Sequence, residues 1–112
     1  MKHMSLDSQQ FEILAGQLAA LSNPHRLRII AILKRHGRRY VSELARIAEM
    51  SRPLLYLHLE KLETAKLVKS HLSLSAEGKA LKWFEVCDFE ISLSPDAIAA
   101  VADPIMHKEN RS

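Results

Sequence analysis

Apolar residues in the first third of the chain recur at the spacing of amphipathic helices. Positions i, i+3, i+4 and i+7 of the first stretch hold Phe11, Leu14, Ala15 and Leu18. This spacing predicts a helix over residues 7–21. Residues 24–36 are apolar on every side in their middle, which predicts a second, buried helix. Asn23 is suited to cap it, Pro24 to occupy its first position, and Gly37 to end it in a left-handed conformation.

The next stretch predicts two short helices joined by a tight turn. Residues 38–41 form a short extended link, after which Ser42 is placed to cap a helix over residues 43–49. Ser51 is placed to cap the following helix, which continues to about Ala65 and tolerates a proline in its first turn. The inward stripe of that helix is Leu55, His58, Leu59 and Leu62.

From residue 68 the helical period gives way to partial alternation. Residues 68–74 and 81–91, with a turn at residues 76–79 between them, predict a β-hairpin with a long second strand. Apolar residues occur on both faces of the second strand. The alternation therefore leaves the register of that strand open and allows a bulge in it.

One more helix signal follows the hairpin. Ser94 is suited to cap a helix and Pro95 to begin it, and an acidic residue in the first turn adds support, so we expect a helix over residues 95–102. The resulting order is helix, helix, extended link, helix, helix, hairpin, helix. We therefore predict a mainly α fold with a small β-hairpin, α-α-β-α-α-β-β-α, which is the order of a winged helix-turn-helix.

Length and composition fit one globular domain. The chain has 112 residues, of which 47% are hydrophobic and 26% are charged. We assign residues 7–104 to a single domain with the winged helix-turn-helix order. Residues 1–6 are interpreted as a disordered N-terminus or the remnant of a tag, and residues 105–112 as a C-terminal tail.

The single cysteine, Cys87, excludes a disulfide within the chain and a Cys-x-x-Cys metal or redox pair. No apolar run approaches the length of a membrane span, and no signal-peptide pattern opens the chain. We therefore expect a cytoplasmic protein with no membrane partner. Cys87 is interpreted as a small buried apolar residue rather than a redox thiol.

Positive charge is concentrated in one part of the chain. Residues 22–82 hold 13 lysines or arginines against 5 acidic residues, a net charge of +8, although the whole chain carries only +3. Such a region predicts a partner that is a polyanion. A helix that begins at Ser51 fits the major groove of DNA, and a hairpin beside it reaches the phosphate backbone. Double-stranded DNA is therefore the predicted partner.

Three segments carry a resemblance to a known family. They are residues 18–33, which include Ala-Leu-Ser-Asn-Pro-His-Arg-Leu-Arg-Ile, residues 50–68, Met-Ser-Arg-Pro-Leu-Leu-Tyr-Leu-His-Leu-Glu-Lys-Leu-Glu-Thr-Ala-Lys-Leu-Val, and residues 91–98. In these strings the chain resembles ArsR-type transcriptional regulators over about residues 10–102. The resemblance implies a winged-helix homodimer, paired through its first and last helices, that regulates transcription. We predict repression by occlusion of a promoter.

The chain also departs from the pattern of that family. Residues 42–48 lack the Cys-x-Cys of the metal-sensing members, so we predict no metal site and no cofactor, and the sequence specifies no small-molecule effector. Lys66 stands where a glycine usually follows the recognition helix. Either this lysine adopts a left-handed conformation or the helix ends differently.

The predicted DNA contacts centre on the helix after Ser51, which the resemblance makes the recognition helix. Arg52 and Tyr56 lie one turn apart and are predicted to contact base edges or phosphates, with a thymine methyl as one target of the tyrosine ring. Basic side chains around the turn and on the hairpin are predicted to neutralise phosphates. The complete set is Ser51, Arg52, Pro53, Tyr56, Leu57, Lys61, Arg38, Arg39, Lys69 and Lys79.

A second function remains open at this point. The outer face of the recognition helix is unusually apolar, which would also suit a winged-helix protein-interaction module without specific DNA binding. The concentrated basic charge favours DNA. His58, on the inward stripe, is interpreted as a structural histidine, and Trp83 and Phe84 as core residues. No arrangement typical of catalysis is present in the sequence, so we predict that the protein is not an enzyme.

Overall fold

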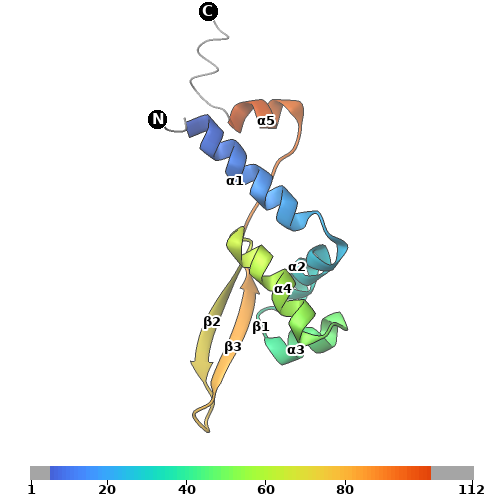
Figure 1. Ribbon diagram of the computed structural model, residues 1–112, viewed down its shortest axis with the longest axis vertical. Coiled ribbons are helices and arrows are strands. Elements are labelled where there is room, and N and C mark those ends of the chain that lie inside the picture. The colour runs from blue at the N-terminus through green and yellow to red at the C-terminus, as the bar shows by residue number, and fades with distance from the viewer. Residues whose placement is uncertain (1–5, 102–112) are drawn as a thin grey trace, which may run out of the picture. The chain divides into compact units, whose positions relative to one another are not determined.

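The structure is a computed structural model that describes residues 6–101, and it is mainly helical with a small antiparallel sheet (Figure 1). Its elements are α1 (Leu6–Leu21), α2 (Pro24–His36), β1 (Arg39–Tyr40), α3 (Val41–Ala48), α4 (Arg52–Thr64), β2 (Val68–Leu74), β3 (Ala80–Val86) and α5 (Pro95–Val101). This order confirms the predicted winged helix-turn-helix. The described residues fall into two compact units, residues 17–88 and residues 6–16 with 89–101.

The sheet has the strand order β1-β3-β2, and both pairs of strands are antiparallel. Phe84 of β3 lies opposite Arg39 and Ser70, whereas Trp83 lies opposite Tyr40 and His71. Because neighbouring residues of a strand point to opposite faces, Trp83 and Phe84 lie on different faces of the sheet, and their exposure shows which face is internal. Phe84 is 1% exposed and Trp83 is partly exposed, so the Phe84 face is the buried one.

The core of the first unit lies between this face of the sheet and helices α2, α3 and α4. The predicted inward stripe of α4 is confirmed, since all four of its residues are buried. Three helices thus cover one face of a small sheet, and the hairpin of β2 and β3 projects beyond them (Figure 1). The largest fully buried side chains are Phe84, Ile29, Leu33, Leu44, Leu55, Leu59, Leu62, Leu67 and Val68.

Three predicted helix caps are present in the structure. The Asn23 side-chain oxygen accepts hydrogen bonds from two backbone N–H groups in the first turn of α2, at 2.8 and 3.2 Å. The Ser51 hydroxyl accepts one from the N–H of Leu54 at 3.3 Å, and the Ser94 hydroxyl accepts one from the N–H of Ala97 at 2.9 Å. These bonds satisfy N–H groups that have no partner inside their own helices.

The cap predicted for α3 was wrong. The helix begins at Val41 and not at residue 43, and Ser42 lies inside it. The backbone N–H of Tyr40 instead donates to the Glu43 carboxylate at 3.1 Å, so an acid at the third helical position reaches back to the helix start. Val41 is only 6% exposed, and its burial also favours a helix that begins at this residue.

The second strand of the hairpin is shorter than predicted, because β3 ends at Val86 and not at residue 91. Val86 pairs with Val68, the first residue of β2, so the chain beyond it has no partner strand.

The end of α2 also differs in detail from the prediction. Gly37 has a positive φ of 78°, as expected, but its ψ of −174° lies outside the left-handed helical region.

Among residues 6–101, two residues other than glycine adopt left-handed conformations, at the ends of α3 and α4. Glu49, in the turn between these helices, has a φ of 56°, and Lys66 has a φ of 64°. Of the two alternatives at Lys66, the left-handed lysine is therefore the one observed. Each such residue costs about 1 kcal/mol relative to glycine.

The second unit contains the first part of α1 and the segment that carries α5. None of the residues of α5 is buried. Large apolar side chains in this unit are exposed to solvent: Phe11 37%, Ile13 58%, Leu93 56% and Ile98 42%. Ala102, the predicted end of the last helix, lies outside the described residues, as do the predicted tail and most of the N-terminal segment. None of the helices in the described part of the chain is long and apolar enough to cross a membrane.

Candidate nucleic-acid interface

The two sides of α4 differ sharply in exposure. Its inward residues are between 0% and 8% exposed, whereas Leu54 is 41%, Tyr56 44% and Leu57 53% exposed. The residues at the start of the helix, from Ser51 to Pro53, are exposed as well. The structure therefore places six of the ten predicted contact residues on the solvent side of one helix. They are Ser51, Arg52, Pro53, Tyr56, Leu57 and Lys61.

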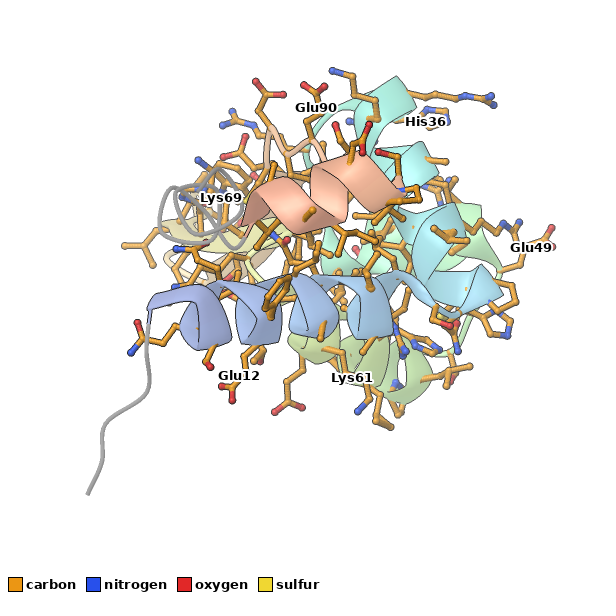
Figure 2. All side chains as sticks on the ribbon, turned by 90° about the horizontal axis from the view of Figure 1, so that it is seen from above. Glu12, His36, Glu49, Lys61, Lys69 and Glu90 are labelled. Carbon is orange, nitrogen blue, oxygen red and sulfur yellow. The ribbon has the colours of Figure 1, made fainter. Side chains whose placement is uncertain are left out.

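The sequence analysis missed Glu60, which also belongs to this surface. Pro53, Leu57, Glu60 and Thr64 stand at i, i+4, i+7 and i+11 and are all exposed, so they form the most outward line of α4. Glu60 follows Leu57 by three residues, and this helical spacing could have shown that both lie on the same face. A carboxylate in this position is able to accept a hydrogen bond from a cytosine amino group. Lys61 lies beside this line, and its side chain points away from the helix (Figure 2).

Lys79 is held in the turn of the hairpin. The Ser75 hydroxyl accepts hydrogen bonds from the N–H groups of Glu77 and Lys79, at 3.2 and 3.1 Å, and the Ser75 N–H donates to the Lys79 carbonyl at 2.8 Å. Gly78 has a φ of 84°, which this tight turn requires. The turn is therefore ordered by its own bonds and places one cation at the projecting end of the hairpin.

The other three predicted residues, two in the sheet and Arg38 directly before β1, already have local partners. The Arg38 guanidinium lies 4.2 Å from the centroid of the Trp83 ring, and Arg39 donates to the Arg38 carbonyl at 2.8 Å. The Lys69 ammonium lies 3.7 Å from the Glu85 carboxylate, at the end of the hairpin opposite to its turn. The structure does not bring these three together with the start of α4.

Two exposed leucines on the hairpin were also not anticipated. Leu72 is 72% and Leu74 is 74% exposed, and both lie on the same face of the sheet as buried Val68. Alternation puts them on the same face as Val68, but none of the helices within residues 17–88 reaches this part of the hairpin (Figure 1). The apolar face of the sheet thus continues beyond the core and into solvent.

The recognition helix is fixed to the rest of the first unit by an arginine of α2. The Arg26 guanidinium donates to the Ala20 carbonyl at 2.6 Å and to the Nδ1 atom of His58 at 3.2 Å. Because arginine has no acceptor, Nδ1 must be the unprotonated nitrogen and Nε2 must carry the hydrogen. His58 Nε2 is buried and has no hydrogen-bond partner among the described residues. The histidine is therefore structural, as predicted, and neutral.

Acid is expected to destabilise the protein through His58. Its burial, together with the charges of Arg26, His25 and Lys61, lowers the pKa of His58 from 6.5 in the folded state. The unfolded chain therefore binds more protons between that lower pKa and 6.5. We expect the free energy of unfolding to fall as the pH drops through this window, by at most about 1.4 kcal/mol per pH unit.

Urea unfolding at about pH 7.5, 6.5 and 5.5 measures this dependence. His58→Gln, which does not titrate, should flatten it. His36→Gln is the matched control, because it makes the same substitution at the exposed His36, at the end of α2 (Figure 2), outside the contact between Arg26 and His58. Of the two variants, His58→Gln should show the flatter dependence, since it alone removes the buried imidazole. Equal pH dependence in wild type and His58→Gln would contradict the assignment.

Within the described residues no three His, Cys, Asp or Glu side chains are grouped so that they could hold a metal ion. Cys87 is half-buried and has a free thiol, and its backbone N–H donates to the Leu67 carbonyl at 2.9 Å. What the candidate interface offers is therefore an exposed helix start, an ordered hairpin turn and several cations. Groups of these kinds are the ones that proteins use to bind a polyanion and to contact base edges.

Known proteins resemble this chain in sequence and in fold. A helix-turn-helix domain family matches residues 21–71. An uncharacterised HTH-type transcriptional regulator of Methanocaldococcus jannaschii is 39% identical over 79 residues, which cover 70% of this chain and 81% of that protein.

Solved structures extend the likeness to nearly the whole chain. One is the homodimeric winged helix-turn-helix DNA-binding domain from Mycobacterium bovis, named a possible ArsR-family transcriptional regulator (TM-score 0.63, 19% identity, 99% of this chain and 91% of that one). Another is NolR from Sinorhizobium fredii (TM-score 0.57, 25% identity, 99% and 95%). The chain therefore belongs to the HTH-type transcriptional regulators, which are DNA-binding proteins and not enzymes, and it has the winged-helix fold of the ArsR type.

Proposed function

We propose that this regulator binds a specific sequence of duplex DNA as a homodimer and represses transcription by occluding a promoter. The observation that carries the proposal is the two-sidedness of α4. Its inward stripe is buried, while the line through Pro53 and Leu57 and the side chains beside it are exposed to solvent. A helix with this exposure, beside a projecting hairpin, suits entry into the major groove.

Within this proposal the predicted contacts take different roles. Arg52 and Tyr56 contact base edges, helped by Ser51, Pro53 and Leu57. Lys61 and Lys79 contact phosphates from the helix and from the turn of the hairpin, and Arg38 and Arg39 do so from the edge of the sheet. Lys69 is the weakest of the ten, since the carboxylate of Glu85 already neutralises it.

The homodimer is supported by the second unit. Exposed apolar side chains on the first part of α1 and around α5 are costly in a monomer, and a second copy of the chain would cover them. A homodimer with two-fold symmetry places two recognition helices about one turn of DNA apart. The operator is therefore expected to be partly palindromic.

The test is fluorescence anisotropy of a labelled duplex from upstream of the protein's own gene, beside a scrambled duplex. We expect tighter binding to the native duplex, because base contacts add to the phosphate contacts that both duplexes share. Arg52→Ala should reduce the preference by about 5- to 150-fold, the value of one good bidentate base contact, and Tyr56→Ala by about fourfold, the value of an apolar contact with one methyl group.

The control is Arg28→Ala, which removes an exposed arginine from α2 and should leave the preference intact. No binding to either duplex at low salt would contradict the proposal. It would favour a protein partner for the apolar face of α4, to which Leu54 and Leu57 contribute.

A further inference from the structure

We infer that the exposed face of α4 reads thymine methyl groups, so that the operator half-site is rich in A·T pairs where it faces Leu54, Tyr56 and Leu57. This inference rests on the proposed function. Leu57 is 53% exposed on the most outward line of the helix, and Leu54 and Tyr56 flank it at 41% and 44%. Thymine is the one base that presents an apolar group, its C5 methyl, in the major groove.

The polar groups of the same face leave few other means of reading a base. The Ser51 hydroxyl accepts the N–H of Leu54 at 3.3 Å, and its remaining O–H can bond to any base, so it does not distinguish one base from another. Residues 51–64 contain no asparagine or glutamine, the side chains that read adenine through two hydrogen bonds. Arg52 and Glu60 remain for guanine and cytosine. An A·T pair is therefore distinguished on this face mainly through its thymine.

Charge identifies DNA, and not a protein, as the occupant of this apolar face. Lys61 flanks it on one side and Arg52 stands at its start, within a region of net charge +8 between residues 22 and 82. Apolar side chains framed by cations match the major groove, where thymine methyls lie between two phosphate backbones. An apolar protein partner would gain nothing from that charge.

The experiment begins with selection of bound duplexes from a randomised pool by the full chain. In the selected site, thymines are then replaced by deoxyuridine, which keeps the base pairing and removes only the methyl group. We expect the Kd to rise about fourfold for each contacted methyl, and about 16-fold when both half-sites are changed together.

Leu57→Ala should show a smaller difference between the thymine and deoxyuridine duplexes than the wild type, because only Leu54 and Tyr56 then contact methyl groups. Leu27→Ala is the matched control, because Leu27 has the same 53% exposure but lies on α2, and this variant should keep the full difference. A selected site that binds equally well with deoxyuridine would overturn the inference and leave the proposed function standing. Failure to select any sequence, with no duplex bound, would overturn both.

Discussion

Phe84→Ala is expected to lower the free energy of unfolding by about 3–5 kcal/mol, the cost of removing a fully buried phenylalanine. Phe84 is 1% exposed and belongs to β3, the central strand of the sheet, so its ring meets the helices on the internal face. A domain of this size has a total stability of only about 5–15 kcal/mol. The variant is therefore expected to lose much of its folded population at moderate temperature.

Urea unfolding followed by circular dichroism measures the change. Leu72→Ala is the matched control, because Leu72 lies on the same face of the sheet but is 72% exposed. Its removal should change the stability by no more than about 0.5 kcal/mol. A loss below about 1 kcal/mol in Phe84→Ala would contradict the placement of the core on this face of β3.

Most of the fold could be predicted from local signals in the sequence. The caps at Asn23, Ser51 and Ser94 each depend on a side chain bonding to backbone two or three residues away, so short windows of sequence contain the whole interaction. The inward stripe of α4 was equally visible, because a helix exposes its packing pattern every three or four residues. The turn of the hairpin followed from Gly78 for the same reason.

The wrong cap of α3 was a local error, between Tyr40 and Glu43, but the errors in β3 arose where a distant partner decides. The length of β3 depends on where β2 begins, since Val86 is the last residue with a strand opposite it. The prediction that Trp83 and Phe84 are both core residues was wrong for Trp83, which is partly exposed, because α2, α3 and α4 lie on the Phe84 face of β3. Alternation within one strand contains neither fact.

The candidate site was predictable only in part, for a related reason. The start of α4 is one contiguous segment, so its exposed residues were found together. Arg38 and Lys69 were chosen for charge alone, but the register of the sheet gives them Trp83 and Glu85 as neighbours. Exposure of Leu72 was equally hidden, because it results from the helices ending before the hairpin does.

The affinity for the operator is expected to fall steeply with salt. Four cations in each chain, Arg38, Arg39, Lys61 and Lys79, give about eight phosphate contacts in a homodimer. Because each contact releases about 0.9 counterions, the slope of log affinity against log salt should be about −7. Affinity should then fall about 10⁴-fold between roughly 50 and 200 mM salt, which anisotropy titrations at several salt concentrations measure directly.

The same slope tests the role of Lys79 and the number of chains bound. Lys79→Ala removes two phosphate contacts from a homodimer, so the slope should become less steep by about 1.8, whereas a monomer would lose only about 0.9. Lys69→Ala is the control from the other end of the hairpin, and its effect should be smaller because Glu85 already pairs with that ammonium at 3.7 Å.

Ile98→Asp places a charge on the exposed apolar side of α5 and is expected to separate the two chains without unfolding residues 17–88. Sedimentation equilibrium should show a monomer, and the salt slope should fall to about half, since one chain then meets the DNA with its own cations alone. If Lys79→Ala left the slope of log affinity against log salt unchanged, the turn of the hairpin would not belong to the interface. A slope in Ile98→Asp equal to that of the wild type would show that the chains bind DNA independently of each other.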